Sequence, residues 1–115
     1  MMRYRALLSL PLLGLIAACA GGSGKSATLV LMNPDWNRVH VEAVVTRSDD
    51  CSQKTSYIAV HHFEMGKGQT HSVVAPDAEN ICWRHDRDPN NPTPGLWSDW
   101  SRATMFPGQT TSTDL

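Results

Sequence analysis

Histidine is the side chain in this sequence with the widest chemistry, because imidazole binds transition metals and exchanges protons near neutral pH. The chain has five histidines, at positions 40, 61, 62, 71 and 85. Adjacent His61 and His62 would point to opposite faces of a strand and so could not bind one ion together. His40 and Glu42 would share a strand face, but no Cys-x-x-Cys or His-Glu-x-x-His spacing supports a metal site. We therefore expect no metal ion and no other cofactor.

One arrangement would still bring two histidines together. If the chain forms a hairpin with a two-residue turn at Gly66-Lys67, His62 lies opposite His71 and the pair supplies two nitrogens of a metal site. A three-residue turn pairs His71 with Phe63 instead and removes the site. A metal-handling protein that uses surface histidines is therefore the alternative function.

Catalytic spacings are missing from the sequence. No serine stands in a Gly-x-Ser-x-Gly elbow, and Asp86 with Asp88 is more readily a solvated hairpin end than an acid–base pair. The tripeptide Gly24-Lys25-Ser26 lacks the earlier glycine of a phosphate-binding loop, because position 19 is a cysteine. We expect neither enzymatic activity nor nucleotide binding.

The N-terminus has the features of an export signal. An apolar run from Ala6 to Ala18 follows Arg3 and Arg5, and small residues precede Cys19. The segment Ile16-Ala17-Ala18-Cys19 resembles the lipobox of bacterial lipoprotein precursors. The resemblance implies that residues 1–18 are a signal peptide and that acylated Cys19 anchors the protein to a membrane. The alternative, a transmembrane helix, fits less well: thirteen residues span about 20 Å and a bilayer core about 30 Å.

The same resemblance implies that the protein is located in the bacterial cell envelope. In Gram-negative lipoproteins an aspartate after the acylated cysteine favours the inner membrane, and Ala20 occupies that position here. We therefore favour the outer membrane. Residues 19–27 would be the lipidated N-terminus and a flexible tether, because glycine and serine are abundant there.

Two cysteines remain once Cys19 carries lipid. Cys51 and Cys82 form an even pair in an oxidising compartment, which predicts a disulfide. Closing a loop of about 32 residues would stabilise the fold by about 3–4 kcal/mol. The alternative is two unpaired buried thiols.

Charge argues against nucleic acid as a partner. The chain has 10 lysine and arginine residues and 11 aspartate and glutamate residues. Removal of Arg3 and Arg5 with the signal peptide leaves 8 basic and 11 acidic residues, a net charge of −3. A domain with this balance has no basic footprint for nucleic acid.

Apolar residues recur with a period of two, which is typical of β-strands. The clearest case is Arg38–Thr46, where Val39, Val41, Ala43 and Val45 alternate with residues that we expect to face mainly water. No stretch of ten residues has the pattern of an amphipathic helix. We predict an all-β sandwich of six or seven short strands over residues 28–107, followed by a polar C-terminal tail at 108–115. The expected strands are 28–32, 38–46, 57–64, 69–74, 80–87 and 97–106.

The end of the domain resembles a known hairpin. Trp97-Ser98-Asp99-Trp100-Ser101 matches a Trp-Ser-x-Trp-Ser pattern after a strand that contains Trp83-Arg84, and this resembles the last hairpin of fibronectin type III domains. The resemblance implies an immunoglobulin-like sandwich in which Arg84 stacks on Trp97 or Trp100. Such a cation–π contact is worth about 0.5–2 kcal/mol.

The longest connection is a candidate binding loop. Residues 86–96 contain three prolines and one glycine, and Asn90, Asn91 and Thr93 are its candidate contact residues. The other interpretation is a loop that the fold merely tolerates. We expect a non-catalytic binding or assembly module that faces the periplasm and contacts an envelope protein or cell-wall material.

Overall fold

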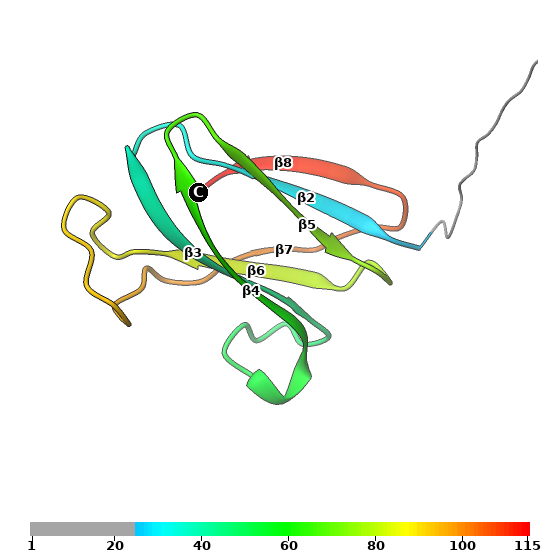
Figure 1. Cartoon of the computed structure of the whole chain (residues 1–115). Helices are drawn as coiled ribbons and strands as arrows, with labels where there is room; N and C mark the ends of the chain where they lie inside the picture. The colour runs from blue at the N-terminus through cyan, green and yellow to red at the C-terminus, as the bar shows by residue number, and fades with distance from the viewer. Residues whose placement is uncertain (1–24) are drawn as a thin grey trace, which may run out of the picture.

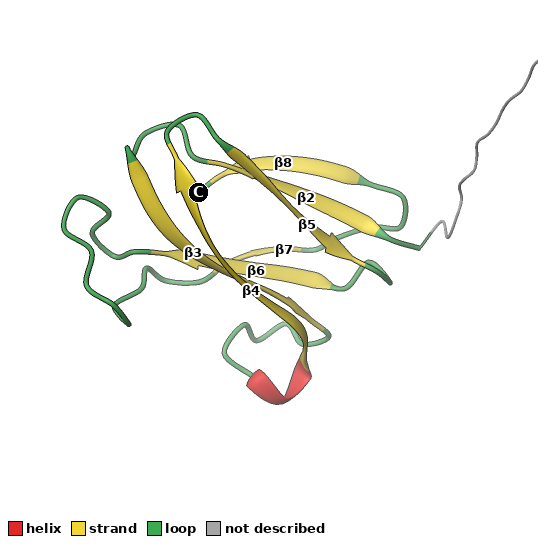
Figure 2. Ribbon diagram, viewed as in Figure 1, coloured by secondary structure: helices red, strands yellow, loops and turns green. Residues whose placement is uncertain are grey.

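The computed structural model describes residues 25–115, which form strands in two layers (Figures 1 and 2). The described strands are β2 (Ala27–Met32), β3 (Arg38–Thr46), β4 (Tyr57–Gly66), β5 (Thr70–Ala75), β6 (Asn80–His85), β7 (Ser101–Ala103) and β8 (Thr110–Asp114). A single turn of 3-10 helix, η2 (Lys54–Ser56), precedes β4. The all-β sandwich prediction is confirmed. The predicted signal peptide and the lipidation site Cys19 lie outside the described residues.

The two sheets have different sizes. One has three strands in the order β5-β2-β8, and the other has four in the order β4-β3-β6-β7. Neighbouring strands are antiparallel except β2 and β8, which run parallel. Across residues 25–115 no helix is long and apolar enough to cross a membrane.

The core lies between the sheets, where the alternating patterns meet. Val39, Val41, Ala43 and Val45 of β3 are buried there, as the period of two predicted. They pack in one cluster with Leu29 and Leu31 of the facing sheet and with other buried side chains. Full burial of an aliphatic side chain of this size contributes about 1.5–3 kcal/mol, so this cluster is the main source of stability.

The expected hairpin of β4 with β5 does not form. Gln69 N donates to Gly66 O in the turn, but β5 then leaves β4 and pairs with β2 in the other sheet. Asn33 fixes this crossing, because its N–H donates to Gln69 O and its C=O accepts from Gly68 N. The buried Asn33 side chain also donates to Met65 O at 3.3 Å. Local periodicity predicted both strands correctly and their partners wrongly.

The predicted polar tail at residues 108–115 is also wrong. Thr110–Asp114 form β8, which pairs with β2 along its whole length. Leu115 N donates to Met32 O at 2.9 Å, and the Leu115 side chain packs against the core. Threonine carries little hydrophobic signal, yet it fits a half-buried strand well. At the other end, Ala27 is already buried in β2, so the expected tether is shorter than residues 19–27.

Two residues expected to face water are buried. Val44 and Thr46 of β3 have no exposed surface, because the chain returns over this side of the four-stranded sheet. Val44 packs with Cys51, Cys82, Tyr57 and Trp100 in a second apolar cluster. The last predicted strand, 97–106, shortens to the three residues of β7.

Candidate functional site

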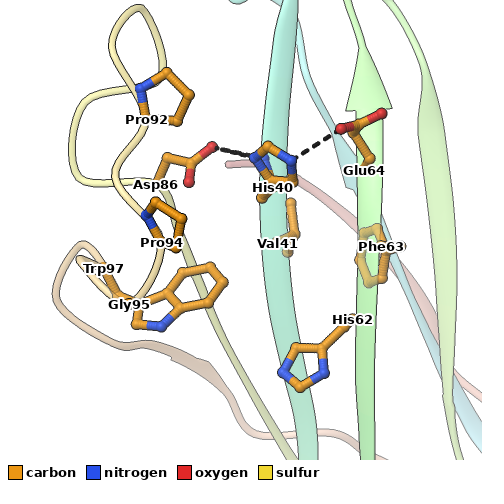
Figure 3. A pocket seen from close by; sticks show the side chains of 10 residues that line it. All are labelled: His40, Val41, His62, Phe63, Glu64, Asp86, Pro92, Pro94, Gly95 and Trp97. Carbon is orange, nitrogen blue, oxygen red and sulfur yellow. Dashed lines mark hydrogen bonds and ion pairs between the residues drawn. The ribbon is translucent and has the colours of Figure 1, made fainter.

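A pocket of about 620 Å³ opens on the outer face of the four-stranded sheet, and we call it the loop pocket. Its floor comes from β3 and β4, and one wall is the connection after β6 (Figure 3). The lining residues are His40, Val41, His62, Phe63, Glu64, Asp86, Pro92, Pro94, Gly95 and Trp97. Ligand sites of small molecules usually enclose about 300–1,000 Å³, so the pocket has a suitable size.

Two His-x-Glu triplets form the floor of the site. In the antiparallel register of β3 and β4, His40 lies opposite Glu64 and Glu42 lies opposite His62. Because alternate residues of a strand share a face, all four side chains project outward from the sheet. The triplets are visible in the sequence, but their pairing depends on a register that the sequence does not specify.

His40 is held between two carboxylates. Its ring Nδ1 lies 2.9 Å from Asp86 Oδ2, and its ring Nε2 lies 2.9 Å from Glu64 Oε2 (Figure 3). Asp86 Oδ2 also accepts a hydrogen bond of 2.8 Å from the His40 backbone N–H. Arg38 Nε lies 3.2 Å from Glu64 Oε2 at the rim. The imidazole is therefore fixed in orientation on both sides.

Glu42 is the centre of a second polar group. Its carboxylate accepts hydrogen bonds from Arg84 at 2.7 Å and contacts His62 Nε2 at 2.6 Å. Burial alone would raise the pKa of Glu42, but the hydrogen bonds and charges of His62 and Arg84 lower it below its ordinary value. Glu42 therefore stays ionised and holds Arg84 in place.

Arg84 lies across both tryptophans of the C-terminal pattern. Its guanidinium carbon is 4.2 Å from the centre of the Trp100 ring and 5.3 Å from that of Trp97. This is the arrangement that the fibronectin type III resemblance implied. Arg102 does not extend the stack, because its Nη1 donates to Asp49 O at 2.8 Å.

A disulfide joins Cys51 to Cys82 beside this stack, with 5.9 Å between the Cα atoms. It ties the connection between β3 and β4 to the middle of β6. Tyr57 reinforces the tie, because its hydroxyl donates to Cys51 O. The pairing predicted from the sequence is present.

The loop at residues 86–96 is closed and ordered by its own turns. Arg87 N donates to Leu96 O at 3.1 Å, and Asp86 pairs with Trp97 as an isolated bridge. Turns at Asp88–Asn91 and Thr93–Leu96 each carry a backbone hydrogen bond of 3.0 Å. The candidate contact residues Asn90, Asn91 and Thr93 are exposed on this loop, but they do not line the pocket, whereas the neighbouring Pro92 and Pro94 do.

The roles of Asp86 and Glu64 were not predicted from the sequence. Asp86 was expected at a solvated hairpin end, whereas its side chain is only 7 % exposed beneath the loop. Strand parity did indicate part of the role of Asp86. This residue directly follows β6 and falls on the same outer face as Arg84. What the parity could not show is that the loop returns to cover that face.

The pairing of His62 with His71 that a two-residue turn would give is absent. His62 projects outward beside Glu42, whereas His71 stacks on Phe63 with ring centres 3.6 Å apart. Burial, and then the charge of nearby His61, lower the pKa of His71 below its ordinary value. No group of three or more metal-binding side chains occurs within residues 25–115.

The pocket lining supplies hydrogen-bonding groups, charged groups and apolar contact surface. A carboxylate that orients a histidine, as Asp86 orients His40, is also found in catalytic triads. Here the outer imidazole nitrogen already contacts Glu64, and no serine, threonine or cysteine is among the pocket-lining residues of the described chain. No protein family matches the chain, and no match was found among curated proteins or among solved structures.

Proposed function

We propose that this protein is a non-catalytic binding or assembly module that holds its partner in the loop pocket. The observation that carries the proposal is the loop at residues 86–96, which is fixed at both ends over a polar sheet face. Asp86 N donates to His40 O at 3.1 Å at one end, and the Asp86–Trp97 bridge closes the other. A loop held on a rigid sheet is a usual place for binding residues.

The surrounding contacts supply the rigidity that a binding site needs. The Glu42 carboxylate contacts His62 of the pocket floor, Arg84 stacks on Trp97 of the pocket lining, and the disulfide holds Cys82, two residues before Arg84 on β6. Each restrains a neighbouring strand or connection, so the polar groups keep their positions before a ligand arrives. Such preorganisation lowers the entropic cost of binding.

The proposal includes a subcellular location. The lipobox-like segment that ends at Cys19 supports a lipid-anchored protein of the bacterial cell envelope, with the outer membrane favoured. The partner would then be an envelope protein or cell-wall material. Mass spectrometry of the membrane fraction should find a diacylglycerol-modified Cys19 at the mature N-terminus. An unmodified chain that begins elsewhere would contradict this part of the proposal.

Photo-crosslinking in intact cells tests the binding site. Probes at Asn90 and Thr93 lie on the exposed loop beside the pocket, and a probe at Ser112 lies on the exposed face of the other sheet. We expect one discrete adduct from each loop probe and none from Ser112. Adducts from Ser112 alone, or none from the loop, would refute the proposed site.

A further inference from the structure

The loop pocket contains a buried carboxylate oxygen that has no protein donor. Asp86 Oδ2 accepts from the His40 N–H and contacts the His40 ring, whereas Oδ1 has no hydrogen-bond donor among residues 25–115. The Asp86 side chain is 93 % buried, which corresponds to its exposed fraction of 7 %. In Figure 3 the contact with His40 is drawn from one of the two carboxylate oxygens only. An unpaired buried acceptor costs free energy, so a ligand that donates to it is favoured.

A second carboxylate faces the same space. Glu64 Oε2 contacts Arg38 and His40, whereas Oε1 has no donor among the residues that the structure describes. The pocket therefore presents two acceptor oxygens from two acidic side chains on different strands. Asp86 Oδ1 belongs to a buried side chain, whereas the Glu64 side chain is 47 % exposed, so water can also donate to its Oε1; both groups carry negative charge when ionised.

The pocket lining of the described chain has no lysine and no arginine, and its two histidines are His62 and His40, the second of which contacts both carboxylates. Of the two nearest arginines, Arg84 pairs with Glu42 at 2.7 Å outside the lining, whereas Arg38 pairs with Glu64 itself at 3.2 Å on the rim. Asp86 and Glu64 together bring two carboxylates against Arg38, the single arginine among the described residues that contacts either of them, so the balance of acidic and basic side chains disfavours an anionic ligand. A positively charged ligand would meet complementary charge.

The remaining wall is apolar. Pro92, Pro94 and the indole of Trp97 line the side of the pocket opposite Glu64 (Figure 3). Such surfaces suit an aliphatic stem, and an indole also attracts an organic cation. A bare metal ion would gain nothing from them, and the described residues offer no group of three metal ligands.

From these groups we infer that the loop pocket recognises an organic cation, an ammonium or guanidinium group on an apolar stem. The inference rests on the proposed function and names the chemistry of its ligand. Asp86 Oδ1 and Glu64 Oε1 accept the donated hydrogen bonds, while Trp97 and the two prolines pack against the stem. The cation belongs either to a small amine or to a lysine or arginine side chain of a partner polypeptide.

The test titrates the full chain, purified in nonionic detergent and labelled with ¹⁵N, with n-butylamine and with agmatine. The readout is the indole N–H signal of Trp97, assigned with Trp97→Phe. n-Butanol is the neutral probe of the same shape, and Zn²⁺ and Ca²⁺ are the metal probes. We expect saturable shifts with the two amines and none with butanol or the metal ions.

Three variants locate the charge that matters. Glu64→Gln and Asp86→Asn should each weaken amine binding by about tenfold or more, because each removes a charge-assisted hydrogen bond. Asp114→Asn removes an exposed carboxylate from the other sheet and should leave the affinity unchanged. Glu64 is at the surface, so Glu64→Gln stays informative if Asp86→Asn does not fold.

The outcomes separate this inference from the proposed function. Equal binding of butanol and butylamine, or saturation by a metal ion alone, would overturn the cation assignment. Absence of amine binding with crosslinks still present from Asn90 and Thr93 would overturn it too, and would leave the binding site standing. A lysine peptide that binds more tightly than butylamine, and loses affinity when acetylated, assigns the cation to a polypeptide; equal affinities assign it to a small amine.

Discussion

The two sheets present very different faces to their surroundings. The outer face of the three-stranded sheet carries uncharged side chains apart from one carboxylate: Thr28, Val30, Met32, Thr70, Ser72, Val74, Thr110, Ser112 and Asp114. The outer face of the four-stranded sheet carries a disulfide, a cation–π stack, three carboxylates and the loop pocket. Both sheets share one apolar core, so the core does not explain the difference.

The difference comes from the connections. The connection between β3 and β4 and the one between β6 and β7 both return over the four-stranded sheet, and each is tied to it. Cys51–Cys82 ties the first connection, and Asp86 and Trp97 tie the second. The three-stranded sheet receives no such covering from the described chain. The comparison suggests that one face of the sandwich supports the fold and that the other is specialised.

Loss of the disulfide should have the largest effect on the covered face. The double variant Cys51→Ala/Cys82→Ala should lower the free energy of unfolding by about 3–4 kcal/mol, because its unfolded chain is no longer restrained by the closed loop. Denaturant unfolding followed by circular dichroism measures the change. The matched double variant on the uncovered face, Ser72→Ala/Ser112→Ala, should stay close to the parent protein. Similar stability of all three proteins would contradict the structural role of the tie.

Arg84→Ala should cost less, about 2 kcal/mol. The change removes the contacts with Trp97 and Trp100 and leaves the carboxylate of Glu42, which is only 15 % exposed, without its arginine. Thermal unfolding measures the loss. Arg47→Ala is the control, because Arg47 is exposed at the start of the next connection and should change stability by less than about 0.5 kcal/mol. Equal melting temperatures of the two variants would mean that the stack contributes nothing.

These predictions also show what local sequence patterns can and cannot reveal. The pattern in Arg38–Thr46 predicted β3 with its observed bounds, because apolar residues at every second position are compatible with a strand that buries one face. The same reasoning missed β8, because threonines and serines give no hydrophobic signal, and it paired β5 with the wrong strand. Partner choice depends on Asn33 and on contacts between distant residues, which periodicity does not contain.

The site was harder to predict than the fold for the same reason. The disulfide of Cys51 with Cys82 and the stacking of Arg84 could be predicted from residue type and strand parity. Asp86 and Glu64 were not, since their role arises only when the loop folds back over a register-matched pair of strands. A chain with two His-x-Glu triplets gives a hint of the site, but the register decides whether the triplets face each other.

The acid stability of the protein should depend on the covered face through Glu42. Its pKa is lower in the folded protein than its ordinary value of 4.5, so the unfolded state binds more protons between the two values. The stabilisation is present above pH 4.5 and is lost as the pH falls through the folded value. Glu42→Gln should therefore flatten the decline in stability below pH 4.5, measured by denaturant unfolding at a series of pH values. Asp114→Asn is the control from the uncovered face, and an equal flattening by that variant would remove the distinction between the faces.

The smallest effect should come from placing charge on the uncovered face itself. Ser72 and Ser112 flank Val30 in the register of the three-stranded sheet, and both are exposed. Ser72→Lys and Ser112→Lys each add a solvated cation that has no buried partner to disturb, so stability should change by less than about 0.5 kcal/mol. The crosslinked adduct from Thr93 should also persist, because the loop pocket lies on the opposite side of the sandwich. If either lysine abolishes that adduct while the protein stays folded, the partner contacts both faces. The uncovered face would then be a binding surface as well, and the distinction between a face that supports the fold and a face that binds a partner would be wrong.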